Sequence, residues 1–359
     1  MNEDPIITPR PDLDGRPLSG DRTGGKIGVM GAGLIGCYVG GLLAEAGRNV
    51  VMVGRGRIQG EIAQGGLRLT RFDGEPLAPE GFLYATDVSA LAGCDTVIVT
   101  VKSQDTEDAA RAMLPHLDEG TLIVSFQNSL GNRRRLTSVM PFRPILMGVV
   151  PFNVTSPEPG RFHKGTEGAL LLERSTDPRV LEMREDFARV GQELELREDM
   201  LDVMWGKLLL NLNNPLNALH GGTLRSGLRQ GAYRRVLARL IAEALAALDA
   251  AGIAPRATGR VPPRWLPRLL RLPSVLYVPL MDLLLRIDPE ARSSMLDDLE
   301  LGRGSENDML QGEIIRLGRR HGVRVETNRR VAEATADAFA AGTSPRMSGR
   351  DMVRAFLKG

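Results

Sequence analysis

Residues 26–36, KIGVMGAGLIG, join a short apolar run to a glycine-rich turn that opens a helical pattern. A strand before GxGxxG and a helix after it is the context in which this motif binds a dinucleotide. The first glycine permits the tight turn, the second lets the backbone approach a pyrophosphate, and the third lets helix and strand pack closely. Amides at the helix start then hold the phosphates. We expect a cofactor loop, rather than a turn without ligand, made of Gly31, Ala32, Gly33, Leu34, Ile35 and Gly36.

The end of the second apolar run, 49–53, indicates which dinucleotide is bound. A site for NAD usually has an acidic residue there, which binds the ribose hydroxyls. Here the chain reads VGRGR over 53–57, and no acid is present. A guanidinium can bond a phosphate through two parallel hydrogen bonds. Arg55 therefore favours the 2′-phosphate of NADPH/NADP+ over the alternative of a solvated loop arginine, and Arg57 is the weaker candidate.

The first half of the chain continues to alternate strand and helix patterns. Apolar runs lie at 95–101, 121–126 and 145–150, with helical patterns at about 104–114 and 130–138. Such alternation predicts an α/β, doubly wound parallel sheet of the Rossmann type.

From about residue 178 the patterns are mostly helical, over 179–190, 199–219, 232–251, 296–317 and 328–339. We therefore expect a disordered leader over 1–25, an NADP-binding Rossmann domain over 26–175, and an all-α domain for substrate binding and dimerisation over 176–359.

Composition limits the classes of function. The 359 residues carry a net charge of +2, which gives no general case for nucleic acid or membrane as a partner. Only Cys37 and Cys94 are cysteines, which fits a reducing, cytoplasmic location rather than a disulfide framework. The apolar runs are too short for a transmembrane helix. The scattered histidines predict no metal site, and no GxSxG motif indicates a serine hydrolase.

Two expected strand ends carry polar residues. Lys102 and Ser103 follow the run 95–101, and Gln127 and Asn128 follow the run 121–126. Ligands of open α/β sheets lie beyond the carboxyl ends of the strands. Ordinary turn chemistry explains such residues equally well, Asn128 in particular.

The segment 205–215, WGKLLLNLNNP, is the most informative part of the helical half. Lys207, Asn211 and Asn214 are spaced to share one helical face, and the leucines around them predict a buried helix. Buried polar groups need partners, so a polar cleft or a structural network at a domain interface is expected. Burial also lowers the pKa of a lysine, which suits a proton donor.

A second informative segment is RSSM over 292–295, followed by SEND over 305–308. Either Ser293 or Ser294 could cap a helix. Glu306 lies on a helical pattern rich in charge, where a solvated glutamate is the ordinary interpretation.

Together these motifs resemble the ketopantoate reductases (2-dehydropantoate 2-reductases). The resemblance covers 26–340 and rests on GAGLIG (31–36), Arg55, VKS (101–103), QN (127–128), WGKLLLN (205–211), SSM (293–295) and SENDMLQGEI (305–314). It implies a Rossmann domain and a helical domain with the active site in the cleft between them. It also implies NADPH-dependent reduction of a 2-oxo acid to a 2-hydroxy acid in pantothenate synthesis.

The resemblance further implies roles for single residues. Lys207 would be the general acid, and Glu306 would bind substrate and help to hold the lysine. Lys102 and Asn128 would line the nicotinamide end of the site. The substrate would be bound by Asn211 at its hydroxyl, by Ser294 at its carboxylate, and by Asn214.

The chain departs from the family pattern in three places. The asparagine–proline pair is one residue closer to Lys207 than in some members, and Ala291 stands where some have asparagine. The stretch 254–290 is longer than in compact members, and we expect it to cover the substrate cleft or to form a contact in a homodimer. These departures leave two alternatives open: a paralogue that reduces another 2-oxo acid, or a non-catalytic NADPH-binding redox sensor.

Overall fold

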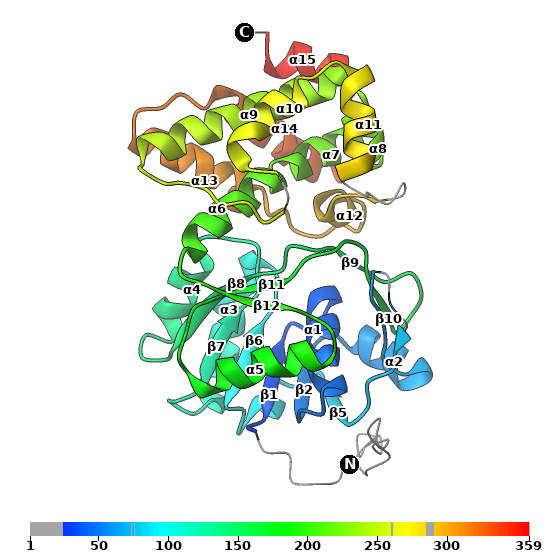
Figure 1. Cartoon of the computed structure of the whole chain (residues 1–359), viewed down its shortest axis with the longest axis vertical. Helices are drawn as coiled ribbons and strands as arrows, with labels where there is room; N and C mark the ends of the chain where they lie inside the picture. Colours follow the sequence, from blue (N-terminus) through cyan, green and yellow to red (C-terminus); the bar gives the residue numbers. More distant parts are fainter. Residues whose placement is uncertain (1–23, 73, 75, 260, 285–290, 359) are drawn as a thin grey trace. The chain divides into compact units, whose positions relative to one another are not determined.

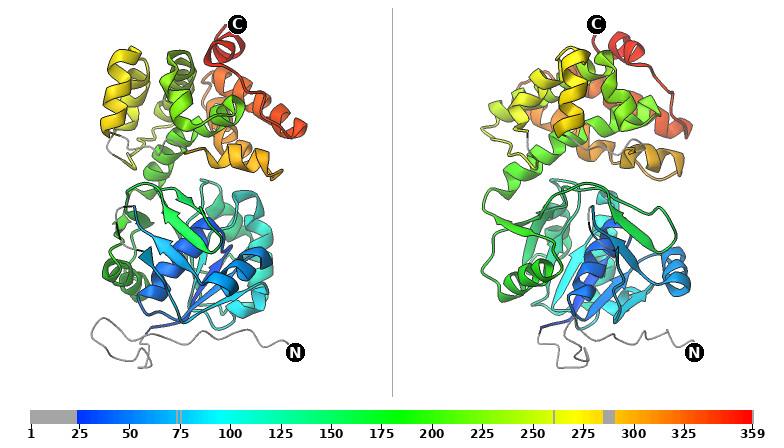
Figure 2. Two further views of the ribbon diagram at one scale, coloured as in Figure 1. Left: turned by 90° about the vertical axis from the view of Figure 1, so that its right-hand side faces the viewer. Right: turned by 45° about the vertical axis from the view of Figure 1, so that its right-hand side comes forward.

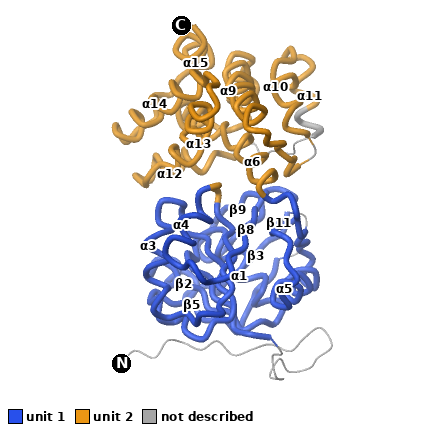
Figure 3. Tube along the Cα trace, turned by 90° about the vertical axis from the view of Figure 1, so that its left-hand side faces the viewer, with its two compact units in different colours: residues 1–127, 131–200 blue, residues 128–130, 201–359 orange. Residues whose placement is uncertain are grey.

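The computed structural model describes residues 24–72, 74, 76–259, 261–284 and 291–358. Its chain divides into two compact units, shown in Figure 3. Unit 1 ends at residue 200, and unit 2 comprises 201–359 together with 128–130. The leader expected over 1–25 lies, except for its last two residues, outside the described part of the chain.

Unit 1 is built on an eight-stranded sheet of order β12-β11-β8-β7-β6-β1-β2-β5 (Figure 1). Its strands are β1 (Ile27–Met30), β2 (Val50–Val53), β5 (Phe82–Ala85), β6 (Thr96–Val99), β7 (Leu122–Ser125), β8 (Ile145–Val149), β11 (Leu170–Glu173) and β12 (Leu194–Arg197). All neighbours pair in parallel except β8 and β11. The chain leaves β1 for β2 on one side and later returns to β6 on the other. The predicted Rossmann sheet is confirmed, with its switch point at β1.

The helices of unit 1 are α1 (Leu34–Glu45), α2 (Gly56–Gly65), α3 (Thr106–Met113), α4 (Asn132–Val139) and α5 (Pro178–Arg189). Helix α1 is almost wholly buried, because its apolar residues pack on the sheet and on α5. A second sheet of order β4-β3-β10-β9 also contacts α1 and was not expected from the sequence. Its strands are β3 (Arg68–Thr70), β4 (Pro76–Leu77), β9 (Val154–Thr155) and β10 (Arg161–Lys164).

The change to the helical unit comes at residue 200 rather than near the expected residue 175. Strand β12 pairs in parallel with β11, and the intervening helix α5 packs on α1. These elements therefore belong to the core of the first unit although they follow its six-stranded parallel portion in sequence.

Unit 2 consists, in its described residues, of helices: α6 (Met200–Asn211), α7 (Asn213–His220), α8 (Leu224–Arg229), α9 (Gly231–Ala250), α10 (Leu266–Leu270), α11 (Ser274–Leu284), α12 (Ser294–Glu300), α13 (Asn307–Arg320), α14 (Glu326–Ala341) and α15 (Gly349–Phe356). Helices α10, α13, α14 and α15 pack around α9 (Figures 1 and 2). None of the helices in the described residues is long and apolar enough to cross a bilayer.

Two helices expected to be continuous are interrupted. The helix expected over 199–219 breaks at Leu212, because Pro215 has no N–H to donate to the carbonyl of Asn211. The helix expected over 296–317 breaks between Glu300 and Asn307, and Gly302 there adopts a φ of +62°. A left-handed glycine of this kind commonly ends a helix.

The described residues of the stretch 254–290, which are 254–259 and 261–284, are part of unit 2 rather than a separate extension. Arg234 of α9 is buried and donates to the carbonyls of Leu228, Leu270 and Leu272 at 2.8–3.2 Å. Its guanidinium also lies over the ring of Tyr277, 4.1 Å from the ring centre. One arginine thus attaches α10 and the start of α11 to α9.

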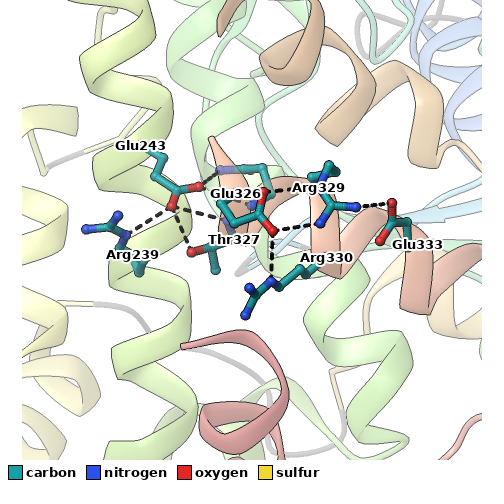
Figure 4. Close-up of polar contacts among 8 residues, drawn as sticks. Arg239, Glu243, Glu326, Thr327, Arg329, Arg330 and Glu333 are labelled. Atoms are coloured by element: carbon teal, nitrogen blue, oxygen red, sulfur yellow. Dashed lines mark hydrogen bonds and ion pairs between the residues drawn. The ribbon is translucent and has the colours of Figure 1, made fainter. Parts of the chain in front are cut away.

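A buried carboxylate on α9 caps α14 from outside (Figure 4). Glu243 is 4% exposed and accepts from the backbone amides of Thr327 and Asn328 at 3.2 and 3.1 Å. It also accepts from the Thr327 hydroxyl at 2.8 Å and from Arg239 at 3.0 Å. The first amides of α14 therefore find their acceptor on another helix.

We expect Glu243→Ala to lower the free energy of unfolding by about 2–4 kcal/mol, because it leaves buried donors without an acceptor. Urea denaturation followed by circular dichroism measures the loss. The matched control is Glu333→Ala, which removes an exposed ion pair with Arg329 on the same helix and should change little. Equal effects of the two substitutions would contradict the capping role.

Candidate active site

The glycine turn is fixed by close backbone contacts. Gly31 has a φ of +95°, and a Cβ there would lie 2.6 Å from the backbone nitrogen of Val101. A Cβ at Gly36 would lie 2.8 Å from the carbonyl oxygen of Gly31. The amides of Gly31 and Ala32 both donate to the carbonyl of Val53, at 3.0 and 2.8 Å. The first and third glycines are thus required by the protein itself.

Gly33 differs from the other two because it faces open space. A Cβ there would come no closer than 3.9 Å to any other described atom that is not its chain neighbour. Among the described side chains none caps the first turn of α1, which begins at Leu34. Bare amides beside an open glycine suit the approach of an anionic group. The loop therefore fits the pyrophosphate of a dinucleotide.

The two arginines after β2 have different surroundings. Arg55 is exposed at the N-cap of α2, and its guanidinium forms no hydrogen bond or ion pair with the described residues. Arg57 is paired with Glu61, one turn along the same helix. The charge of Arg57 is therefore already compensated, and Arg55 is the arginine available to a phosphate.

Two of the four polar residues after β6 and β7 are structural. Gln127 is buried and donates to the carbonyl of Val101 at 2.9 Å and to the Thr106 hydroxyl at 2.8 Å. Ser103 is also buried and accepts from Asn132 at 3.2 Å. These bonds tie the ends of two neighbouring strands together.

The other two remain accessible from solvent. Lys102 is half-buried, and Asn128 is exposed and grouped with unit 2. Thr106 and Asn132, which complete the network of Gln127 and Ser103, were missed by the sequence analysis. Their role becomes visible only when β6 and β7 pair, because that pairing brings the segments after the two strands together.

Lys207 lies on α6 among leucines of the unit 2 core and is half-buried. Removal from water lowers the pKa of its ammonium from 10.5 to about 8, and the negative charge of Glu306 acts in the opposite direction. Glu306 immediately precedes α13 and is only 9% exposed. The interpretation of Glu306 as a solvated glutamate is therefore wrong. The fold brings the two groups into electrostatic contact although 99 positions separate 207 from 306 in the sequence.

The asparagines after Lys207 occupy two helices. Asn211 is the last residue of α6, one turn beyond Lys207, and is half-buried. Asn214 lies in the first turn of α7, beyond the break at Leu212. The expectation that all three side chains share a face of one helix is thus wrong for Asn214.

The serine pair divides into a cap and an exposed hydroxyl. Ser293 caps α12 by accepting from the amide of Leu296 at 3.2 Å, and it donates to the carbonyl of Asn214 at 3.3 Å. Ser294 is the exposed first residue of α12. Asn217, which the sequence analysis missed, is buried on α7 and accepts from the amide of Ser293 at 2.9 Å. It therefore holds the serine segment against the helix that carries Asn214.

Metal and thiol chemistry find no support in the described residues. Those residues contain no group of three or more His, Cys, Asp or Glu side chains placed to hold a metal ion. Cys37 and Cys94 are both buried, and burial raises the pKa of the Cys94 thiol to about 11. Neither sulfur is a candidate nucleophile.

Comparisons with known proteins relate most of the chain to one family of enzymes. Residues 27–176 match the sequence profile of "Ketopantoate reductase PanE/ApbA", and residues 199–338 match that of "Ketopantoate reductase PanE/ApbA C terminal". The chain is 28% identical to the 2-dehydropantoate 2-reductase of Halobacterium salinarum, over 86% of this chain and 97% of the relative. It is 32% identical to that of Pyrococcus horikoshii over a shorter region, 54% of this chain and 64% of the relative.

Solved structures extend this similarity. The PanE/ApbA family ketopantoate reductase from Ralstonia eutropha JMP134 is similar with a TM-score of 0.75 and 28% identity, over 88% of this chain and 99% of that one. D-mandelate dehydrogenase, solved with NADH and anilino(oxo)acetate, shares the fold with a TM-score of 0.72 at 16% identity, over 88% of this chain and 99% of that one.

Proposed function

Because the chain belongs to the ketopantoate reductase family, we propose that it reduces 2-dehydropantoate (ketopantoate) to pantoate with NADPH, as a step of pantothenate synthesis. The family and its named relatives are oxidoreductases that act on a CH–OH group. The observation that carries the proposal is Lys207, a half-buried lysine whose pKa lies near 8 beside the buried carboxylate of Glu306. A proton donor of this kind is what reduction of a carbonyl needs.

NADPH supplies the hydride when it is bound. The open glycine Gly33 and the first amides of α1 support a pyrophosphate site, and exposed Arg55 supports a site for the 2′-phosphate. Lys102 and Asn128, which follow β6 and β7, would line the nicotinamide end. These residues would orient the cofactor.

Lys207 protonates the carbonyl oxygen of the substrate as the carbonyl carbon is reduced. A pKa of about 8 leaves the ammonium mostly protonated at neutral pH, yet lets it release its proton more readily than an exposed lysine does. Its positive charge also stabilises the negative charge that develops on the oxygen. Glu306 helps to hold the lysine and binds substrate, and Asn211, Asn214 and Ser294 bind the hydroxyl and carboxylate groups.

A paralogue acting on another 2-oxo acid is the second candidate. Ala291 and the long stretch 254–290 favour it. The same fold also occurs in D-mandelate dehydrogenase, which is not named as a ketopantoate reductase. A redox sensor that binds NADPH without turnover is a third, for which the exposed Trp265, Val275 and Leu276 would be the partner surface. A sensor has no need of Lys207 and Glu306.

Mixing the purified protein with NADPH and ketopantoate tests the proposal. We expect NADPH to be oxidised in equimolar amount to the pantoate formed. Binding of NADPH, seen by its fluorescence, without oxidation in the presence of any 2-oxo acid would identify a sensor instead.

Arg55→Ala tests the choice of cofactor. We expect the ratio of kcat/KM for NADPH to that for NADH to fall about 10- to 100-fold, because charge-assisted bonds to the 2′-phosphate are lost. Steady-state kinetics with each cofactor measure this ratio. Arg57→Ala is the matched control, since Glu61 already pairs with that arginine, and it should leave the ratio nearly unchanged. Full NADPH preference in Arg55→Ala would show that Arg55 does not bind the phosphate.

A further inference from the structure

A tyrosine from a neighbouring strand fills the space behind the glycine loop. Tyr84 lies on β5, in register with Met52 of β2, which in turn pairs with β1. Its phenol is buried, and the hydroxyl donates to the carbonyl of Ala32 at 2.7 Å. A residue outside the glycine motif therefore holds the middle of that loop.

The phenol also contacts the turn that carries Arg55. A Cβ at Gly54 would lie 2.2 Å from the Tyr84 hydroxyl and 2.8 Å from the carbonyl oxygen of Ala32. Glycine is thus needed at position 54 because the phenol oxygen and the loop carbonyl occupy the space beside it. The amide of Gly54 is itself held by the carbonyl of Ala85, the residue after Tyr84.

The phenol oxygen thus lies beside Gly54, the residue immediately before Arg55. Burial raises the pKa of Tyr84, so the hydroxyl stays protonated and able to donate. A phenol can donate one hydrogen bond and accept others. Tyr84 therefore donates to the glycine loop and packs against the turn that carries Arg55, so a single oxygen contacts both segments.

We propose that Tyr84 is a positioning residue that sets the spacing between the glycine loop and Arg55, and that this spacing determines the preference for NADPH over NADH. The inference rests on the proposed function, in which the loop binds the pyrophosphate and Arg55 binds the 2′-phosphate. Both groups are attached to the same adenosine ribose, at its 5′ and 2′ positions, so both can be bound well only when their sites keep a fixed separation. NADH lacks the 2′-phosphate and uses only the first site.

Tyr84→Phe removes the linking oxygen and keeps the ring. We expect kcat/KM for NADPH to fall roughly 3- to 10-fold, as expected for the loss of one hydrogen bond, and that for NADH to change less than about twofold. The value of kcat at saturating NADPH should not change. The ratio of the two cofactors is measured on one preparation, so partial unfolding of the variant does not alter it.

Two further variants isolate the effect. Gly54→Ala forces a methyl group against the phenol oxygen and should lower the same ratio. Tyr38→Phe removes the hydroxyl of another buried tyrosine of unit 1, whose ring packs against Phe152, and should leave the ratio unchanged.

A double-mutant cycle with Arg55→Ala identifies the route of the effect. In the Arg55→Ala background, Tyr84→Phe should no longer change the NADPH to NADH ratio. Equal losses for both cofactors in Tyr84→Phe, or a ratio change that persists without Arg55, would overturn the proposal while leaving the proposed function intact. If Arg55→Ala alone keeps the full preference, the assignment of the 2′-phosphate to Arg55 fails, and the role of Tyr84 in specificity fails with it.

Discussion

We expect Lys207→Ala to lower kcat by about 10²- to 10⁴-fold, which is the usual contribution of a positioned general acid. The substitution removes both the proton donor and the positive charge that stabilises the developing oxyanion. NADPH should bind the variant as tightly as the wild-type protein, because the glycine loop and Arg55 are unchanged. Single-turnover rates and fluorescence titrations with NADPH measure the two quantities separately.

Two other variants control for the fold. Lys207→Met keeps most of the side-chain volume without the charge and should be as slow as Lys207→Ala. Lys358→Ala removes an exposed lysine of the same unit and should be as active as the wild type. Activity near the wild-type level in both Lys207 variants would remove the catalytic role of this residue.

Glu306→Gln should lower kcat/KM by about 10- to 100-fold and move the alkaline limb of its pH profile to lower pH. The wild-type limb should lie near pH 8, since Lys207 must be protonated to act and loses its proton as pH rises through its pKa of about 8. The carboxylate of Glu306 raises that pKa, so its removal lowers it. A profile of kcat/KM against pH, with substrate below KM, reports the pKa in the free enzyme.

Glu313→Gln is the matched control on the same helix. Its carboxylate pairs with Arg316 at 3.1 Å, and the profile should match that of the wild type. An alkaline limb that stays in place or moves to higher pH in Glu306→Gln would contradict the pairing of Glu306 with Lys207.

The spacing of residues in the sequence predicts best those elements whose contacts join residues that are close together in the chain. Helix α1 follows from residues 34–45 because its backbone bonds join near neighbours, and the glycine turn before it was identified by its motif. The break at Leu212 was also encoded locally, by Pro215, and the leucine pattern around it concealed the signal. Single residues of α6 could therefore be identified, but Asn214 was assigned to the wrong helix.

Contacts of the site between residues far apart in the sequence could not be predicted from such spacing. The burial of Glu306 depends on how α13 begins beside α6, and Asn217 bonds the Ser293 amide across 76 positions. Tyr84 reaches Ala32 only because β5, β2 and β1 are neighbours in the sheet. No motif in one sequence specifies such pairings, so the resemblance to a family provided the role of Glu306 before the fold did.

The central claim is that this protein is an NADPH-dependent reductase of ketopantoate, and a panel of 2-oxo acids tests it most directly. The measurement is kcat/KM with saturating NADPH for ketopantoate, pyruvate, 2-oxoisovalerate and phenylglyoxylate in the same preparation. We expect ketopantoate to have the highest value, by about tenfold or more, since a pocket that bonds the hydroxyl of its substrate discriminates against analogues that lack it. A value for ketopantoate among the lowest of the panel would contradict the account and identify a reductase of another 2-oxo acid.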